Sequence, residues 1–291
     1  MTGLKDILAG APVLLDGAWG TQLQSLGLPT GDVPDAWNLL RPAAVKEVAR
    51  RYVDAGSAVI LTNTFRGNPI SLAGFGLGDR MEEINRAGVR LSREGAGGRA
   101  RVFASIGPSG KMLMSDEVTE ADLRAAFEAQ AGALAAEGAD ALVIETMSDL
   151  EEATIAVRAA KQTGLPVVAS MVFDSGKDHD RTMMGSTPEQ VAVALEEAGA
   201  DVIGANCGLG MEGYVPVARR LRAATDRPIW IKPNAGLPEM IAGMVRYNTT
   251  PEQFASRAPA LTSMGISFIG GCCGTTPEFI RALARTLGRQ P

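Results

Sequence analysis

The sequence predicts an α/β fold, a single-domain (β/α)8 barrel of the TIM type that spans residues 1–291. Short apolar runs alternate with longer amphipathic stretches along the whole chain, as strands and helices alternate in such a barrel. The apolar runs are nearly continuous, which is typical of parallel strands covered by helices. The eight units average roughly 35 residues, and about 250 residues is typical of the barrel. A doubly wound sheet with two edge strands is the alternative.

Each expected strand is an apolar run, and each expected helix is an amphipathic stretch that follows it. In chain order the strands are expected at 13–18, 58–65, 101–107, 141–147, 166–173, 202–207, 228–234 and 267–272. The helices are expected at 43–55, 80–94, 120–137, 150–162, 189–198, 213–224, 252–264 and 278–287.

A Thr-Pro-Glu triplet marks three of the expected helix starts, at residues 187–189, 250–252 and 276–278. In each triplet the threonine is expected to cap the helix, with proline at the first helical position and an acid in the first turn. The triplets therefore support the order in which a strand is followed by a helix.

Composition and charge exclude several classes of partner. The chain is 46% hydrophobic and 21% charged, with a formal net charge of −5. Because it has no basic run, we expect neither nucleic acid nor an anionic membrane as a partner. Lys5 and Asp6 lie where a secretory signal would need apolar residues, and no apolar run reaches transmembrane length. We therefore expect a cytoplasmic protein with reduced thiols.

Polar or metal-binding residues stand at the ends of seven of the eight expected strands. In a (β/α)8 barrel the carboxyl ends of the strands carry the functional groups, so these residues are expected to share one site. They are Asp16-Gly17, Asn63-Thr64-Phe65, Gly107-Pro108, Glu145-Thr146, Cys207, Pro233-Asn234 and Cys272-Cys273.

The three cysteines of the chain, Cys207, Cys272 and Cys273, all stand at such strand ends and lie in glycine-rich motifs. Thiolates are soft ligands that suit Zn²⁺, and a catalytic zinc site typically has three protein ligands and an open fourth position. The single histidine, His179, lies in a polar loop far from these motifs, so a zinc ion would be held by sulfur. The alternative is three buried cysteines that act as small apolar residues.

A zinc ion bound by three thiolates has a net charge of about −1, which makes it a weak Lewis acid toward carbonyl groups. It is a better platform for a further thiol, which the metal deprotonates while the sulfur keeps its electron density. The cysteine set therefore favours alkyl transfer to a thiol over hydrolysis.

Five motifs resemble the homocysteine S-methyltransferases nearly from end to end of the chain: Asp16-Gly17-Ala18, Thr62-Asn63-Thr64-Phe65, Glu145-Thr146, Asn206-Cys207 and Gly270-Gly271-Cys272-Cys273-Gly274. This resemblance implies methyl transfer from a donor to the thiol of L-homocysteine, giving methionine. It implies Zn²⁺ as cofactor, with Cys207, Cys272 and Cys273 as ligands. Asp16 and Glu145 would hold the substrate ammonium, with Thr64 and Asn206 also on the substrate side.

Several of these residues have a second interpretation. Asp16-Gly17 could form a simple turn, and Glu145 could belong to a structural ion pair. Asn206 and Asn234 could hydrogen-bond a loop and orient their neighbours without touching substrate.

The nature of the methyl donor depends on the residues that line the donor side of the site. We assign four residues to that side: Arg66, Thr146, Trp37 and Asn234. By resemblance, Arg66 and Thr146 replace two aromatic residues of the box with which betaine-using members hold a quaternary ammonium. An arginine would repel a cationic donor, so betaine is disfavoured. Trp37 could supply an aromatic wall or pack a loop onto the barrel.

Two donor classes and two alternative functions stay open. The donor could be a small compound such as S-methylmethionine, or a methylcorrinoid carried by a separate protein. In the second case the chain would be the homocysteine-activating subunit of a split cobalamin-dependent methionine synthase, because the motif at 233–238 resembles that module. A non-catalytic barrel with a closed structural zinc site is the alternative from another class.

Overall fold

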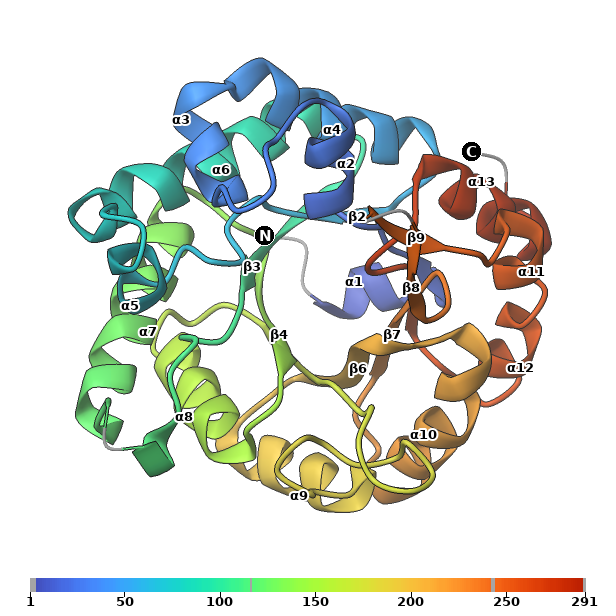
Figure 1. The fold of residues 1–291 in the computed structure, drawn as a ribbon. Helices are drawn as coiled ribbons and strands as arrows, with labels where there is room; N and C mark the ends of the chain where they lie inside the picture. Colours follow the sequence, from blue (N-terminus) through green and yellow to red (C-terminus); the bar gives the residue numbers. More distant parts are fainter. Residues whose placement is uncertain (1–3, 116, 242–243, 290–291) are drawn as a thin grey trace.

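The computed structural model describes residues 4–115, 117–241 and 244–289, which form one closed barrel (Figure 1). Its eight parallel strands are hydrogen-bonded in the order β1-β10-β7-β6-β5-β4-β3-β2. A parallel bridge between Leu15 and Val59 joins the two outer strands of this order and closes the ring. The predicted barrel is therefore confirmed, and the doubly wound alternative is wrong. The ends of the predicted span 1–291 lie outside the described residues.

All eight predicted barrel strands are present. β1 and β10 have two residues each, because the chain leaves the regular ladder early to form the loops of the barrel mouth. The strands are β1 Val13–Leu14, β2 Val59–Leu61, β3 Arg101–Ile106, β4 Ala141–Met147, β5 Val167–Met171, β6 Val202–Gly210, β7 Ile229–Asn234 and β10 Phe268–Ile269.

The predicted helices surround the strands, and one of them is divided. Pro259 lies inside the expected helix at 252–264, where it lacks the N–H of a helix interior, and the structure has two short helices there. The predicted helices appear as α4 Pro42–Asp54, α6 Met81–Ala96, α7 Glu120–Ala136, α8 Leu150–Lys161, α9 Pro188–Ala198, α10 Met211–Ala224, α11 Pro251–Ala255, α12 Ala258–Thr262 and α13 Pro277–Thr286.

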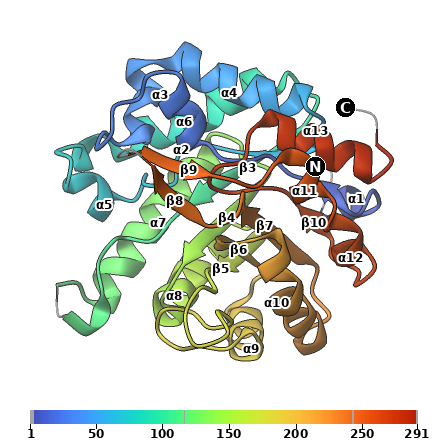
Figure 2. The ribbon, with the colours of Figure 1, turned by 45° about the vertical axis from the view of Figure 1, so that its right-hand side comes forward.

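Further short elements were not predicted. The helices among them are α1 Leu4–Leu8, α2 Gly20–Ser25, α3 Trp37–Leu40 and α5 Pro69–Ala73, with 3-10 turns η1 Pro34–Ala36, η2 Gly78–Arg80 and η3 Leu113–Ser115. A hairpin of β8 Pro238–Ile241 and β9 Met244–Tyr247 follows β7 and pairs antiparallel. Because it follows the carboxyl end of β7, it lies at the barrel mouth (Figures 1 and 2).

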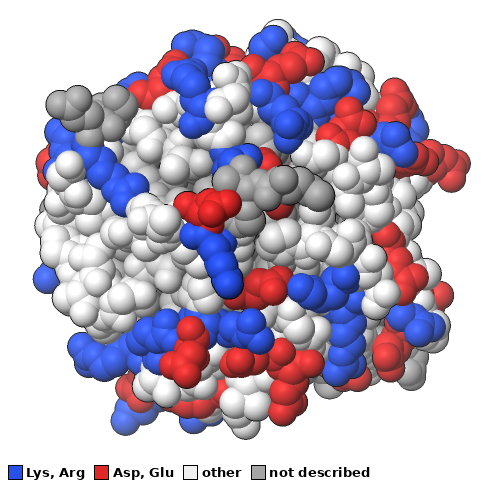
Figure 3. All heavy atoms as spheres, turned by 180° about the vertical axis from the view of Figure 1, so that it is seen from behind, with Lys and Arg blue, Asp and Glu red and all other residues white. Residues whose placement is uncertain are grey.

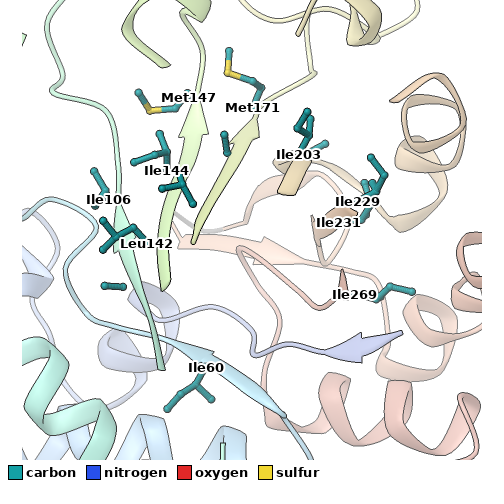
Figure 4. Close-up of a cluster of buried hydrophobic side chains, with 14 of the residues drawn as sticks. Ile60, Ile106, Leu142, Ile144, Met147, Met171, Ile203, Ile229, Ile231 and Ile269 are labelled. Atoms are coloured by element: carbon teal, nitrogen blue, oxygen red, sulfur yellow. The ribbon is translucent and has the colours of Figure 1, made fainter. Parts of the chain in front are cut away.

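The core has two layers, one inside the barrel and one between strands and helices. Val143 belongs to the inner cluster, whereas its neighbours Leu142 and Ile144 belong to the outer cluster, as strand alternation requires (Figure 4). Inside, the ring of Trp230 stacks on Phe103 at 6.3 Å and contacts Phe268 at 5.3 Å between centroids. Leu4, Ile7 and Leu8 pack against this inner cluster at the base. The packed base leaves the carboxyl ends of the strands as the open end.

The surface agrees with the absence of a basic run in the sequence. On the face seen in Figure 3, which carries the base of the barrel, basic and acidic side chains are interspersed. Among the described residues, no helix combines the length and the apolar character needed to cross a membrane.

The three Thr-Pro-Glu helix starts differ in how the threonine is used. Thr187 and Thr250 cap α9 and α11, and each forms a reciprocal capping box with the glutamine three residues later. Thr276 precedes α13 but makes no capping hydrogen bond; its hydroxyl donates to Glu278 at 2.6 Å instead. The predicted N-cap positions are thus confirmed at all three sites, but the capping hydrogen bond from the side chain forms only at Thr187 and Thr250.

This difference predicts that Thr187→Ala destabilises the barrel more than Thr276→Ala does. Loss of a capping side chain costs about 1 kcal/mol, and only Thr187 makes that bond. Urea unfolding of both variants would measure the two free-energy changes. Equal losses would contradict the assignment of the caps.

Candidate metal centre and substrate site

The three cysteines meet at the barrel mouth. Cys207 lies near the end of β6, and Cys272 and Cys273 follow β10. The sulfurs of Cys207 and Cys273 are 3.9 Å apart, and all three sulfurs lie within 4.8 Å of one another. With Zn–S bonds of about 2.3 Å, a tetrahedral site places its sulfurs about 3.8 Å apart. The observed spacing therefore fits zinc.

The end of β7 holds the two cysteine motifs together. Cys207 pairs with Pro233 in the sheet, and the Cys272 N–H donates to the Pro233 carbonyl at 2.7 Å. Two residues after Pro233, the Ala235 N–H donates to the Cys273 carbonyl at 2.9 Å. The backbone at Pro233–Ala235 thus fixes the distance between residues that are far apart in the sequence.

Asn234 is a further polar residue that interacts with one of the cysteines. Its side-chain N–H donates to the Gly208 carbonyl at 3.1 Å, whereas its buried carbonyl oxygen has no hydrogen-bond partner among the described residues. The Asn234 side chain also contributes to lowering the pKa of the Cys207 thiol. Sequence reasoning had placed Asn234 on the donor side.

The three thiols strongly influence one another's ionisation. Hydrogen bonds from Cys272 and Cys273 lower the pKa of Cys207 to about 3. The same closeness to Cys207 raises the pKa of Cys272 to about 12, and it also raises that of Cys273. A divalent cation would relieve this repulsion, because metal coordination stabilises the thiolate form. The donor set therefore fits Zn²⁺.

Asn206 orients the residues around it. Its amide oxygen accepts from Ser170 at 2.7 Å and from the backbone N–H of Thr146 at 2.9 Å. Its amide nitrogen donates to the Thr146 hydroxyl at 2.6 Å and lies 3.9 Å from the sulfur of Cys272. Thr146 is held with a φ of 60°, a left-handed conformation that is costly for a threonine. These contacts support the orienting interpretation of Asn206.

Asp16 has protein partners on both carboxylate oxygens. One oxygen accepts from the ammonium of Lys232 at 2.6 Å. The other accepts from the Trp19 indole and the Leu61 backbone N–H, each at 2.7 Å. Asp16 is fully buried, so its predicted contact with a substrate ammonium would compete with Lys232.

Lys232 was missed by the sequence analysis. A signal for it was present: it lies two residues after Trp230 in an apolar strand, so its side chain faces the barrel interior. A lysine is rarely buried unless it is paired, and a charged residue on that face therefore points to a partner inside the barrel.

Glu145 is the second predicted acid, and it lies on the interior side of β4. Ser105 donates to one of its oxygens at 2.5 Å. Burial raises the pKa of Glu145 to about 7, with Lys232 opposing this and the charges of Cys272 and Asp16 adding to it. Burial of the carboxylate favours an arriving cation as a partner.

Three further predicted residues make no described hydrogen bond to the cysteines. Thr64 is buried, and its hydroxyl donates to the Ser105 carbonyl at 2.7 Å. Arg66 is exposed, with its guanidinium 5.7 Å from the ring centroid of Phe75. Trp37 is buried in the outer core, with Arg41 5.2 Å from its ring. The interpretation of Trp37 as a packing residue is thus the one that the structure supports.

Tyr247 of β9 was also missed, because the hairpin was not predicted. A side chain at Gly274 would come within 2.3 Å of the Tyr247 ring, so the tyrosine packs directly on the cysteine loop. Burial and the charges of Cys273, Cys207 and Cys272 raise the pKa of Tyr247. Gly274, with a φ of 80°, leaves the space that this contact needs.

The homocysteine S-methyltransferase family profile matches residues 13–287. The chain belongs to this family. Methionine synthase of Mycobacterium tuberculosis is 32% identical over 302 residues, which cover 97% of this chain and 25% of the relative. Methionine synthase of Mycobacterium leprae is 31% identical over 307 residues, covering 99% of this chain and 25% of the relative. The chain thus spans about a quarter of the length of these curated relatives.

The homocysteine methyltransferase MmuM of Escherichia coli has the same fold. In its metallated form it superposes with a TM-score of 0.81 at 23% identity, covering 97% of this chain and 99% of MmuM. Family membership confirms the resemblance drawn from the five sequence motifs, and the superposition confirms the barrel.

Near the barrel mouth, a further buried acid predicts a pH dependence of stability. Asp35 accepts a hydrogen bond from the Arg66 backbone N–H at 2.9 Å. Burial raises the pKa of Asp35 from 3.8 to about 7. Between these values the folded state binds more protons than the unfolded state, so this group makes stability fall as the pH rises.

Asp35→Asn should therefore stabilise the protein at about pH 8 more than at about pH 5, by roughly 2–3 kcal/mol. Asparagine keeps an oxygen for the Arg66 N–H and avoids the buried charge. Urea unfolding at both pH values would measure this difference. Asp32→Asn, at an exposed acid of the same loop, is the control. A pH-independent effect of Asp35→Asn would overturn the assignment.

Proposed function

We propose that this chain transfers a methyl group to the thiol of L-homocysteine, giving methionine, with one Zn²⁺ bound by Cys207, Cys272 and Cys273. The observation that carries the proposal is the convergence of three sulfurs at the spacing of a tetrahedral zinc site. Family membership supplies the reaction class. We also propose that residues 1–291 act as one module in a cytoplasmic setting, where thiols stay reduced.

In this proposal each residue has a distinct part. When bound, zinc supplies acidity: it lowers the pKa of a thiol that it coordinates, so that the thiol is a nucleophile at neutral pH. Glu145 receives the substrate ammonium through a charge-assisted hydrogen bond. Asn206 holds Thr146 and Cys272 in place, and the Asn234 side chain contributes to lowering the pKa of the Cys207 thiol. The methyl carbon then passes to the thiolate sulfur, and the bonding electrons of the broken bond stay with the donor.

Substitution of any of the three cysteines by alanine should abolish zinc binding and methyl transfer while the barrel stays folded. The sulfurs lie at the mouth and not in the two packed core layers, so their loss leaves the apolar packing intact. Metal analysis, circular dichroism and methionine formation would be measured for all three variants.

Full zinc occupancy in a variant would remove that residue from the ligand set. X-ray absorption at the zinc edge separates the enzyme from a closed structural site. Addition of L-homocysteine should add one sulfur neighbour in the enzyme, and an unchanged spectrum would favour the structural barrel.

A methylcorrinoid carried by another protein is the second candidate for the donor. Most of the exposed large apolar side chains stand in strand-to-helix connections around the mouth, where a partner would have to reach the cysteines. They are Leu40, Phe75, Met112, Met114, Met183, Met184, Leu237 and Met240. The relatives named methionine synthase are about four times longer than the matched region, which is consistent with a donor-carrying partner.

Glycine betaine should be a poor donor, because the exposed guanidinium of Arg66 repels a quaternary ammonium on the donor side. Zinc-loaded protein and L-homocysteine would be incubated separately with betaine, S-methylmethionine and methylcobalamin, and methionine measured. Arg66→Ala is the matched variant. Efficient turnover with betaine would contradict the assignment of Arg66, whereas turnover with methylcobalamin alone would favour the corrinoid partner.

A further inference from the structure

A fixed cation already occupies the acidic part of the substrate site. The ammonium of Lys232 lies 2.6 Å from the carboxylate of Asp16, and their side chains are 2% and 0% exposed. Among the described ion pairs, this is the one in which both partners are buried. The other described pairs lie at the surface or are partly exposed. A buried pair persists only if its charges are matched, since an unpaired charge is very costly there.

The surroundings hold Lys232 in this place. Its ammonium lies 5.9 Å from the ring centroid of Trp230, at the top of the packed interior. Burial disfavours the charged form of the ammonium, but the neighbouring Asp16, Glu145 and Cys272 outweigh it, so the pKa of Lys232 is raised. Lys232 therefore lies among the two acids predicted to hold a substrate ammonium and one of the predicted zinc ligands.

This arrangement changes what the site requires of its substrate. Two unpaired buried carboxylates would need a cationic group from every acceptor, because burial strongly disfavours charge without a partner. Here Lys232 matches Asp16, and Glu145 alone is left to meet the acceptor.

We propose that Lys232 is a specificity-determining residue that lets the site accept thiols lacking the α-ammonium of homocysteine, in particular ω-thiol carboxylates. The inference rests on the proposed function, since it concerns the acceptor of the same methyl transfer. Glu145 can meet such an acceptor in its neutral form, so no buried charge is left unmatched. Compared with such an acceptor, homocysteine gains affinity only from the single contact between its ammonium and Glu145.

The test compares L-homocysteine with 4-sulfanylbutanoate, the same thiol without its amino group. Binding of each to zinc-loaded protein is measured by calorimetry, which does not depend on a methyl donor. In the unmodified protein the two dissociation constants should differ by only about ten- to thirtyfold, as expected for one charge-assisted contact of about 1.5–2 kcal/mol. In Lys232→Met, Asp16 loses its partner, and homocysteine should be preferred by about a hundredfold or more.

Two further variants keep the test decisive. Lys161→Met removes the half-exposed pair with Asp201 on the outside of the barrel, and it should leave the preference unchanged. Should Lys232→Met fail to fold, Asp16→Asn/Lys232→Met removes both charges and should keep the tolerance of the unmodified protein. Circular dichroism and zinc content would check both.

The outcomes separate the inference from the proposed function. A hundredfold preference for homocysteine in the unmodified protein would overturn the role of Lys232 and leave homocysteine methylation standing. A folded Lys232→Met variant with an unchanged preference would overturn it as well. If neither thiol binds the zinc-loaded protein, the proposed function itself fails.

Discussion

The backbone at the end of β7 is the constraint on which the site depends. Pro233 pairs with Cys207 in the sheet and accepts from Cys272, while Ala235 donates to Cys273. Parallel strands bring their carboxyl ends to one edge, and this shared partner then sets how closely the two cysteine motifs approach. Without it the cysteines would share a barrel face but not the spacing of a metal site.

The polar residues beneath the sulfurs form a layer between the mouth and the packed interior. Lys232 spans from β7 to Asp16 and lies over Trp230, while Ser105 links Glu145 to the third strand. Lys232 and Asp16 neutralise each other, as the low dielectric of the interior requires, whereas Glu145 is hydrogen-bonded by Ser105 and has no ion-pair partner among the described residues. The charge balance of this layer is the feature on which the proposed tolerance toward acceptors rests.

Residues with a strained backbone conformation also lie near the cysteines. Among the described non-glycine residues, positive φ angles occur at Thr146, His179 and Cys207, and two of these three flank the sulfurs. Asn206 stands between Thr146 and Cys207 and bonds both the backbone and the hydroxyl of Thr146. Such conformations persist only where hydrogen bonds determine them, which accounts for a buried asparagine at this position.

The sequence by itself determined the barrel, its eight strands and the strand ends that carry the cysteines, because hydrophobic periodicity and cysteine position are local properties. It also determined the family, since the motifs are contiguous. Only the tertiary structure decided the partners of those residues. The Lys232–Asp16 pair joins residues far apart in the chain, and the hairpin that brings Tyr247 onto Gly274 has no strong periodic signal. Contacts of this kind depend on how strands close into a ring, which no local pattern specifies.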